Sequence, residues 1–456
     1  MRQVNVQTVA DEVEFNRFHG LILFWCALII VFDGYDLAVA GVAMPAIMSD
    51  MGVNATQAGL MASSALFGMM FGAVTLGTFA DRQGRRLAIA ISIALFSIFT
   101  AAAGLATDPL TFSVLRFFAG LGIGGVMPNV VAEMTEYAPR RLRSTLVTLM
   151  FSGYAVGGIL AALLGKTIMQ SFGWQSVFFA AIAPLLLVPF IFGSLPESML
   201  YLLKKGRHDE LRSIVERIDP AYKRASGYSF VLPAGARSGE ASIRRLFAEG
   251  RALSTLMFWV AFFMCLFMVY ALSTWLTKLM SNAGYSLGSA LTFFLVLNVG
   301  AMIGAVGGGW LADRFRIKHV LISMYVLAAV SITLLGQPLP TWALFVTVGL
   351  AGASTIGTQI VINAYAGQFY PSEIRATGLG WGLAVGRGGA ILAPIVIGIL
   401  VSMTLSLELN FVAIAVPAVI AAIAISMIDH GCSAHAKSQE AKVALGSEPE
   451  IERSPA

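Results

Sequence analysis

The sequence predicts an all-α membrane protein with twelve transmembrane helices, arranged as two parallel six-helix halves. Of its 456 residues, 57% are hydrophobic and 12% are charged, whereas an ordinary soluble domain is about half apolar and about a quarter charged. The apolar residues fall in long blocks, and a helix needs about 20 such residues to span the hydrocarbon core of a bilayer. Two short motifs recur at one fixed spacing, which divides the blocks into two equivalent sets.

Each predicted helix is one of these apolar blocks, with basic residues between them. In chain order the twelve helices are residues 21–47, 57–80, 87–106, 109–135, 144–168, 174–194, 253–280, 287–312, 319–337, 340–368, 375–400 and 405–428.

The blocks define five regions of the chain. We expect an N-terminal arm at 1–20, a first half at 21–194, a polar middle loop at 195–252, a second half at 253–428 and a tail at 429–456. Within the middle loop, Arg207–Ile218 has the pattern of an amphipathic surface helix.

The distribution of Lys and Arg predicts the orientation. Of the 30 such residues, 26 fall on one face of the predicted topology, in the arm, the middle loop, the tail and the short loops on the same side. Cytoplasmic loops of membrane proteins carry an excess of Lys and Arg, so we expect both termini to be cytoplasmic. The arm offers no small-residue cleavage site after a short apolar core, and we interpret it as retained rather than as a signal peptide.

The two halves also repeat in sequence. A Gly-x-x-Ala-Asp-Arg motif occurs at 77–82 and again at 309–314, and Pro-x-x-x-Arg-x-Thr occurs at 139–145 and again at 371–377. Both motifs are offset by the same 232 residues. Such a duplication is typical of transporters in which one half rocks against the other.

Several other classes of protein are disfavoured. The net charge of +5 is explained by membrane orientation, so no nucleic-acid partner is expected. The three cysteines provide neither a disulfide framework nor a CxxC site. The five histidines lie in loops or at the cytoplasmic margin, so we expect no metal site and no cofactor.

One glycine motif imitates a dinucleotide site. Gly120-x-Gly122-x-x-Gly125 fits the GxGxxG pattern, but it lies within a membrane helix and no βαβ unit surrounds it. Close helix packing through small residues is the better explanation. The same interpretation covers the glycine runs of the predicted helices 287–312 and 375–400.

These motifs resemble the major facilitator superfamily. Its best-known motif is similar to Gly77-x-x-x-Asp81-Arg82-x-Gly84-Arg85-Arg86, and a second is similar to Arg116-x-x-x-Gly120-x-Gly122-x-Gly124. Asp33-Gly34-Tyr35-Asp36 looks like the signature of its aromatic acid:proton symporters. The segments around it at 24–37, at 126–131 and at 151–154 are most similar to the bacterial benzoate carriers of that group.

The resemblance implies proton-coupled uptake of benzoate or a related aromatic carboxylate by alternating access across the bacterial inner membrane. 4-Hydroxybenzoate or an aliphatic organic acid remains an alternative substrate. Drug antiporters of the superfamily carry GxxxGPxxGG, whereas residues 152–158 lack the proline, which disfavours efflux. A membrane sensor or enzyme is a further alternative, but no soluble domain beyond the middle loop and no nucleophile with a base support it. The expected partners are the substrate, protons and lipid, with a monomer as the working unit.

Asp33 and Asp36 are the candidates for proton coupling. Their i, i+3 spacing places them on one helix face about a turn apart. A carboxylate in a membrane is costly, and two close together disfavour a second negative charge, so one of them is expected to hold a proton. The alternative is a packing pair held by hydrogen bonds, and the residues do not tell which aspartate carries the proton.

Arg116 and Arg387 are the cations deepest in the apolar blocks. Helical rise places Asp36 about 22 Å and Arg116 about 20 Å from the cytoplasmic side, and Arg387 about 18 Å. Arg116 is therefore expected either to pair with Asp36 or to contact substrate. Arg387 has no acidic residue at its level in its own half, so we expect it to bind the substrate carboxylate. Snorkelling, or a contact with a backbone carbonyl, is the alternative.

Charged residues at the cytoplasmic mouth predict a gate. A positive-inside loop explains the arginines, but a charge network that latches the inside closed also explains an aspartate at the helix end in both halves. The predicted gate residues are Gly77, Asp81, Arg82, Arg85, Arg86, Glu133, Arg143, Asp313, Arg314 and Arg375. Tyr154 and Asn298, near mid-depth, are weaker candidates to line a substrate cavity, because an aromatic acid requires apolar walls and a few polar groups.

Overall fold

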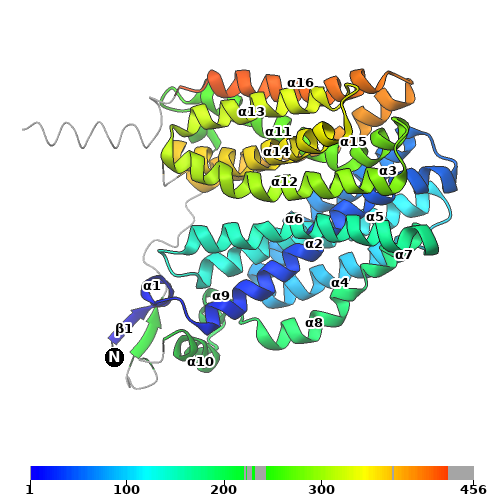
Figure 1. The fold of residues 1–456 in the computed structure, drawn as a ribbon. Coiled ribbons are helices and arrows are strands. Elements are labelled where there is room, and N and C mark those ends of the chain that lie inside the picture. The colour runs from blue at the N-terminus through cyan, green and yellow to red at the C-terminus, as the bar shows by residue number, and fades with distance from the viewer. Residues whose placement is uncertain (1, 220–221, 223–227, 232–242, 372–373, 430–456) are drawn as a thin grey trace, which may run out of the picture.

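The computed structural model of the protein describes residues 2–219, 222, 228–231, 243–371 and 374–429 (Figure 1). Within these residues twelve helical spans are long and apolar enough to cross a membrane, and the predicted all-α membrane fold is confirmed. Residues 430–456 of the predicted tail at 429–456 and the loop residues 372–373 lie outside the described residues.

Six of these spans form the first half of the molecule. They are α2 (Arg17–Met51), α3 (Ala55–Gln83), α4 (Arg85–Ala103), α5 (Pro109–Tyr137), α6 (Arg143–Phe172) and the pair α7 (Gln175–Ala180) and α8 (Ala183–Ser194). The second half contains α11 (Ala252–Asn282), α12 (Leu287–Arg314), α13 (Ile317–Leu334), α14 (Thr341–Phe369), α15 (Arg375–Ser402) and α16 (Leu407–Ser426).

Several helices extend beyond the apolar blocks that predicted them. α2 begins at Arg17 because the Asn16 side chain caps it, accepting the backbone N–H groups of Phe18 and His19. The sixth span, predicted as one helix, is broken in the structure at Ala181. Proline at position 184 lacks a backbone N–H group and is accommodated in the first turn of the second piece.

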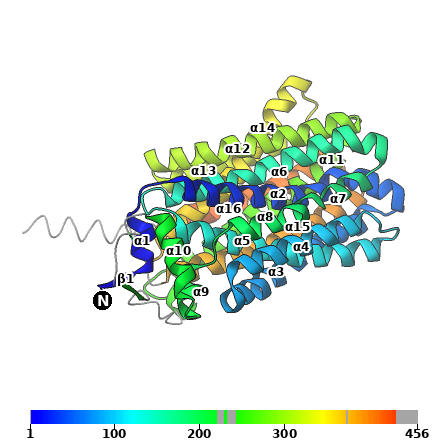
Figure 2. The ribbon, with the colours of Figure 1, turned by 90° about the horizontal axis from the view of Figure 1, so that it is seen from below.

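A small assembly of the N-terminal arm and the middle loop packs on the first half. Strands β1 (Arg2–Asn5) and β2 (Tyr228–Val231) pair in parallel, beside α1 (Val6–Glu12), α9 (Met199–Lys204) and α10 (His208–Ile218) (Figure 2). α10 confirms the predicted amphipathic helix, since it buries Leu211, Ile214, Val215 and Ile218. The N-terminal arm, expected only as a retained segment, is folded, with Val6, Val9 and Ala10 buried.

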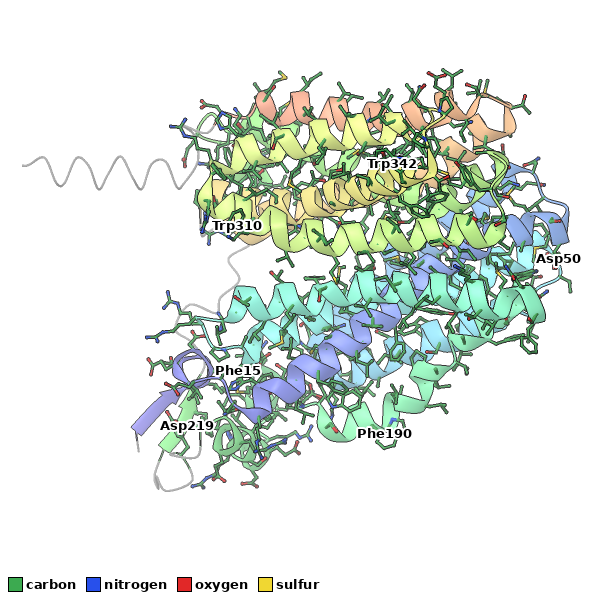
Figure 3. All side chains as sticks on the ribbon, viewed as in Figure 1. Phe15, Asp50, Phe190, Asp219, Trp310 and Trp342 are labelled. Atoms are coloured by element: carbon green, nitrogen blue, oxygen red, sulfur yellow. The ribbon has the colours of Figure 1, made fainter. Side chains whose placement is uncertain are left out.

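The two halves meet at the end of the molecule opposite the N-terminus, which we call the closed end (Figure 1). There Ser63 Oγ of α3 donates to the Ile391 carbonyl of α15 at 2.7 Å, and Thr56 Oγ1 donates to Ser402 Oγ at 2.9 Å. Asp50 lies at this end in Figure 3, and Phe15, Asp219 and Trp310 lie at the other, which we call the open end.

At the open end the halves diverge. A Cβ atom added at Gly77, Gly307 or Gly380 would meet no atom within 4 Å. On the adjoining face of α15, Thr377, Gly380, Trp381 and Ala384 line a hollow of about 280 Å³. The structure is therefore a conformation that is closed at one end and open at the end that carries the loop assembly.

Glycine permits close helix contact at only some positions of the runs. A Cβ at Gly120 would lie 2.0 Å from the Ala65 carbonyl oxygen of α3, and one at Gly304 would lie 2.0 Å from that of Ala353 on α14. These distances confirm packing as the reason for those glycines. Gly307 and Gly309 have open space instead, so a single explanation does not cover the whole run on α12.

Two substitutions on α12 separate these cases. Gly304→Ala forces the α12 and α14 backbones apart, and we expect it to lower the free energy of unfolding in detergent by about 1–3 kcal/mol. Gly307→Ala, one turn away, adds its methyl group to open space and is the matched control. Thermal unfolding of the two purified variants measures the difference, and equal stabilities would refute the packing explanation.

Candidate functional site

Arg116 and Asp36 form an ion pair inside the first half. α5 begins at the N-cap Asp108, whose pKa lies below its usual range because hydrogen bonds from Thr111 favour the carboxylate. Two turns later, Arg116 is 2% exposed, and its Nη1 donates to both carboxylate oxygens of Asp36 at 3.0 and 3.1 Å. Its Nη2 donates to the Asp36 backbone carbonyl at 3.2 Å.

Two further residues complete this ion pair. The Thr100 hydroxyl of α4 accepts from Arg116 Nη1 at 3.0 Å and donates to the Asp36 carboxylate. The Phe178 ring of α7 lies 5.9 Å from the guanidinium carbon of Arg116, in the range of a cation–π contact. Asp36 and Arg116 therefore satisfy each other.

Asp33, one turn away on α2, is in a different environment. Its side chain is fully buried, and neither carboxylate oxygen has a hydrogen-bond partner of good geometry among the described residues. The groups that act on it electrostatically are the Tyr154 hydroxyl of α6, Asp36, and Arg387 of the second half. The two aspartates share a helix but not a partner.

Gly34 places Tyr154 beside Asp33. A Cβ atom at position 34 would lie 2.4 Å from the Tyr154 carbonyl oxygen, so α6 can approach α2 this closely only because residue 34 is glycine. The residue after Asp33 thus brings the phenol of α6 to the aspartate.

Arg387 projects from α15 toward the first half. Its Nη1 lies 3.5 Å from the Tyr270 hydroxyl of α11 and 4.0 Å from the Met69 sulfur of α3, and its Nη2 lies 4.0 Å from the Met127 sulfur of α5. In the described part of the chain Arg387 makes no ion pair with a carboxylate. Its partners are one long hydrogen bond and two weak acceptors.

Asp33, Tyr154, Tyr270 and Arg387 therefore converge from four helices near the middle of both halves. One buried carboxylate and one guanidinium, neither with a strong partner, act on each other through space. Such a site is able to bind a proton on the carboxylate and an anion on the guanidinium. Among the described residues, no group of three or more His, Cys, Asp or Glu side chains is placed to hold a metal ion.

Asn298 contributes to the contact between the halves. Its Nδ2 donates to the Phe294 carbonyl of its own helix at 2.9 Å, and a Cβ atom at Gly158 of α6 would lie 2.2 Å from its Oδ1. Asn298 thus packs where α12 meets α6. Among the residues that the structure describes, no hydrogen bond joins it to Arg387 or Asp33.

Arg85 is the centre of an acidic cluster at the open end. Its guanidinium pairs with Glu136 and lies 3.6 Å from Glu133, and the Glu197 carboxylate accepts its backbone N–H at 2.7 Å. Glu136 also accepts from the Ser198 hydroxyl at 2.9 Å. Glu133 and Glu136 thus face the Arg85 guanidinium, and Glu197 of the middle loop binds the Arg85 backbone.

The other predicted gate residues lie apart from this cluster. Arg143 pairs with Asp11 of the N-terminal arm, Arg314 stacks on Trp310 at 4.4 Å, and Arg375 Nε donates to the Tyr370 carbonyl at 3.4 Å.

Four predicted gate residues remain, three of which the structure places. Arg86 covers the Phe192 ring at 4.5 Å, Asp81 lines a small hollow with Arg85, and Arg82 is exposed. The Asp313 side chain lies outside the described part. In this conformation the predicted gate residues form several local groups rather than one network.

Sequence reasoning missed Thr100, Tyr270, Glu136 and Glu197. Thr100 and Tyr270 are a hydroxyl residue and a tyrosine within apolar helices, where a polar tip at mid-depth is the only available signal. Glu136 follows Glu133 by three residues, which places it on the same face of α5, and that spacing was visible in the sequence.

The chain matches the family described as Major Facilitator Superfamily over residues 26–358 and 298–449. A benzoate transport protein of Acinetobacter baylyi is 44% identical to it over 94% of this chain and 93% of the relative. A gallate transporter of Pseudomonas putida is 34% identical, over 94% of this chain and 95% of the relative.

The fold is also known from solved structures. The partially occluded inward-open form of the xylose transporter of Escherichia coli matches with a TM-score of 0.71 at 18% identity, covering 90% of this chain and 97% of that one. The resemblance inferred from the motifs is confirmed, and the chain belongs to the Major Facilitator Superfamily.

Proposed function

We propose that this transporter couples the uptake of benzoate, or a closely related aromatic carboxylate, to the uptake of protons across the bacterial inner membrane. One observation carries the proposal. Asp33 is a buried carboxylate without a hydrogen bond, and Arg387 is a guanidinium without an ion pair, in the part of the chain that the structure describes. They come from opposite halves and act on each other through space. Support for the substrate comes from the 44% identity with a benzoate transport protein.

The two charges explain how proton and substrate are coupled. In the empty site, the ionised Asp33 offsets the charge of Arg387, and a buried charge without an opposite charge is costly. When Asp33 takes a proton, Arg387 loses that compensation. A substrate carboxylate then restores it, and the planar guanidinium provides two parallel hydrogen bonds for it. Release of one ligand disfavours retention of the other.

Asp36 and Arg116 serve as a structural anchor in this scheme. Their charges already satisfy each other in the interior of the first half, with Thr100 and the Asp36 backbone as further partners. A group engaged in this way exchanges a proton only by breaking the pair. We therefore assign the proton to Asp33 and substrate binding to Arg387.

The walls of the site suit an aromatic ring. Met69 and Met127 lie against the guanidinium and present polarisable apolar surface, and methionine sulfur makes favourable contacts with aromatic rings. Tyr154 and Tyr270 add two further aromatic side chains to the site.

The open end is proposed to face the cytoplasm, with both termini and the middle loop on that side. The support is the concentration of Lys and Arg in these segments. Closure of this end would bring Gly77, Asp81 and Arg82 of the first half toward Asp313, Arg314 and Arg375 of the second, which gives the predicted gate its role. The working unit is proposed to be one chain with its substrate, protons and the surrounding lipid.

Uptake of labelled benzoate into cells that produce the protein tests the proposal. We expect the cells to accumulate labelled benzoate and an uncoupler to abolish this accumulation. Unlabelled aromatic acids are expected to inhibit uptake of the label more strongly than aliphatic acids do. Preferential competition by 4-hydroxybenzoate would make that acid the substrate instead. Uptake that the uncoupler leaves unchanged would contradict proton coupling.

Asparagine substitutions distinguish the two aspartates. Asp33→Asn cannot bind and release the proton, so we expect it to abolish accumulation against a gradient while substrate exchange across proteoliposome membranes continues. Asp36→Asn leaves Arg116 as an uncompensated buried charge, and we expect a loss of about 3–5 kcal/mol in stability. Normal accumulation by Asp33→Asn, after its folding is verified, would exclude Asp33 as the proton carrier.

Lysine at position 387 tests the substrate role of the guanidinium. Arg387→Lys keeps the charge but loses one of two parallel hydrogen bonds to a carboxylate, so we expect benzoate binding to weaken by about 1.5–3 kcal/mol, or roughly 10- to 150-fold. Benzamide has no carboxylate and serves as the control ligand. Equilibrium binding to purified, folded protein provides the measurement, and equal weakening of both ligands would make Arg387 structural.

A further inference from the structure

Each half contributes one ionisable side chain and one tyrosine hydroxyl to the site, from equivalent helices. Under the 232-residue repeat, Arg387 on α15 corresponds to position 155, next to Tyr154 on α6. Likewise α2, which carries Asp33, and α11, which carries Tyr270, are the first spans of their halves. In the first half, Asp33 is on the first span and Tyr154 is on the fifth. In the second half the order is reversed, with Tyr270 on the first span and Arg387 on the fifth.

The helix packing makes this arrangement rigid in each half. α2 packs on α6, where Gly34 and Gly157 allow backbone contact, and α11 packs on α15, where a Cβ atom at Gly389 would lie 2.1 Å from the Phe263 carbonyl oxygen. Each tyrosine is thus fixed against the charged group of its own half. When the halves move, Tyr154 stays with Asp33 and Tyr270 stays with Arg387.

The direction of the hydrogen bonds gives the two hydroxyl groups different tasks. A guanidinium only donates, so Tyr270 accepts from Arg387 Nη1 at 3.5 Å, and the phenol proton of Tyr270 is left to donate elsewhere. A carboxylate only accepts when ionised, so the Tyr154 hydroxyl, which interacts electrostatically with Asp33, is able to serve it only as a donor.

We propose that Tyr270 binds the substrate directly, donating its phenol proton to the substrate carboxylate beside Arg387, and that Tyr154 serves the proton site at Asp33. This assignment rests on the proposed function and specifies its site. Asp33 faces Tyr154 of α6, Asp36 of its own helix, Arg387 of α15 and Tyr270 of α11, while Arg116 of α5 is engaged by Asp36. Tyr154 is the hydroxyl that belongs to the same rigid half as Asp33.

The test compares three phenylalanine variants, each of which removes a single hydroxyl group. Tyr270→Phe and Tyr154→Phe address the site. Tyr325→Phe is the matched control, because the Tyr325 hydroxyl is buried and donates to the Ala261 carbonyl elsewhere in the second half. Benzoate binding to the purified full-length protein is measured at pH 6 and pH 8, and initial uptake into proteoliposomes is measured from pH 5 to pH 9.

The three variants are expected to change different measured quantities. Tyr270→Phe raises the dissociation constant for benzoate roughly 10- to 150-fold at both pH values, because a hydrogen bond to a charged group is lost, and leaves the shape of the pH profile unchanged. Tyr154→Phe mainly displaces the pH of half-maximal uptake, upward, because the ionised Asp33 is no longer able to receive a hydrogen bond from this hydroxyl and holds its proton to higher pH. Tyr325→Phe changes neither the affinity nor the pH profile.

Each of the other possible outcomes contradicts a specific part of the proposal. A Tyr270→Phe variant that melts like the parent and binds benzoate like the parent refutes direct binding by Tyr270. A pH profile displaced by Tyr270→Phe and not by Tyr154→Phe reverses the assignment. Equal loss of affinity in all three variants makes the hydroxyl groups structural. A parent protein that binds no aromatic carboxylate at all refutes the proposed function, and the tyrosine assignment with it.

Discussion

The ion pair between Arg116 and Asp36 is the interaction on which the arrangement of the first half depends. Both side chains lie in the interior of a membrane domain, where an uncompensated charge is expensive, and removal of one partner of a buried pair costs several kcal/mol. The pair joins α2 to α5 directly, Thr100 adds α4, and Phe178 of α7 covers the guanidinium. Four of the six spans are therefore held in register around one charge pair.

That pair also determines what the neighbouring aspartate can do. With Asp36 satisfied within its own half, Asp33 is left as a buried carboxylate without a hydrogen bond among the described residues, and Gly34 brings the Tyr154 hydroxyl to it. The second half provides the opposite case, a guanidinium held by a tyrosine and two methionine sulfurs. The proposed binding of a proton on one side and of a carboxylate on the other rests on these two unsatisfied charges.

The two ends of the molecule are built from different interactions. At the closed end the halves are joined mainly by hydroxyl groups and backbone carbonyls, with glycines at close contacts such as Gly59 against the Pro394 carbonyl. Lys166, which donates to the Thr292 hydroxyl at 3.2 Å, adds one charged group to these contacts. At the open end, charged groups are satisfied within each half: Arg85 by Glu136, Arg143 by Asp11, and Arg314 by the Trp310 ring. Neutral hydrogen bonds cost little free energy to break when their partners separate into water, whereas charged groups attract each other over longer distances when the halves approach. This contrast fits a transporter whose halves separate at one end while they close at the other.

The sequence by itself determined the membrane class, the twelve spans and the duplication. These properties depend on composition, block length and helical rise, and each is local or strictly periodic along the chain. The same counting placed Asp36 and Arg116 at one level. The ends of the helices were harder to predict, because caps such as Asn16 extend a helix past the hydrocarbon core. The break at Ala181 depends on backbone geometry that hydropathy does not record.

Only the tertiary structure decided which aspartate is paired and which tyrosine accompanies which charge. Asp33 and Asp36 are equivalent in type, burial and periodicity, and they differ only in the helices that face them, since Arg116 comes from α5 while Tyr154 comes from α6. Tyr270 and Arg387 are 117 residues apart, and neither position indicates the other. Contacts of this kind depend on the rotation of each helix about its axis, which is set by packing against neighbours and is not encoded in any one segment.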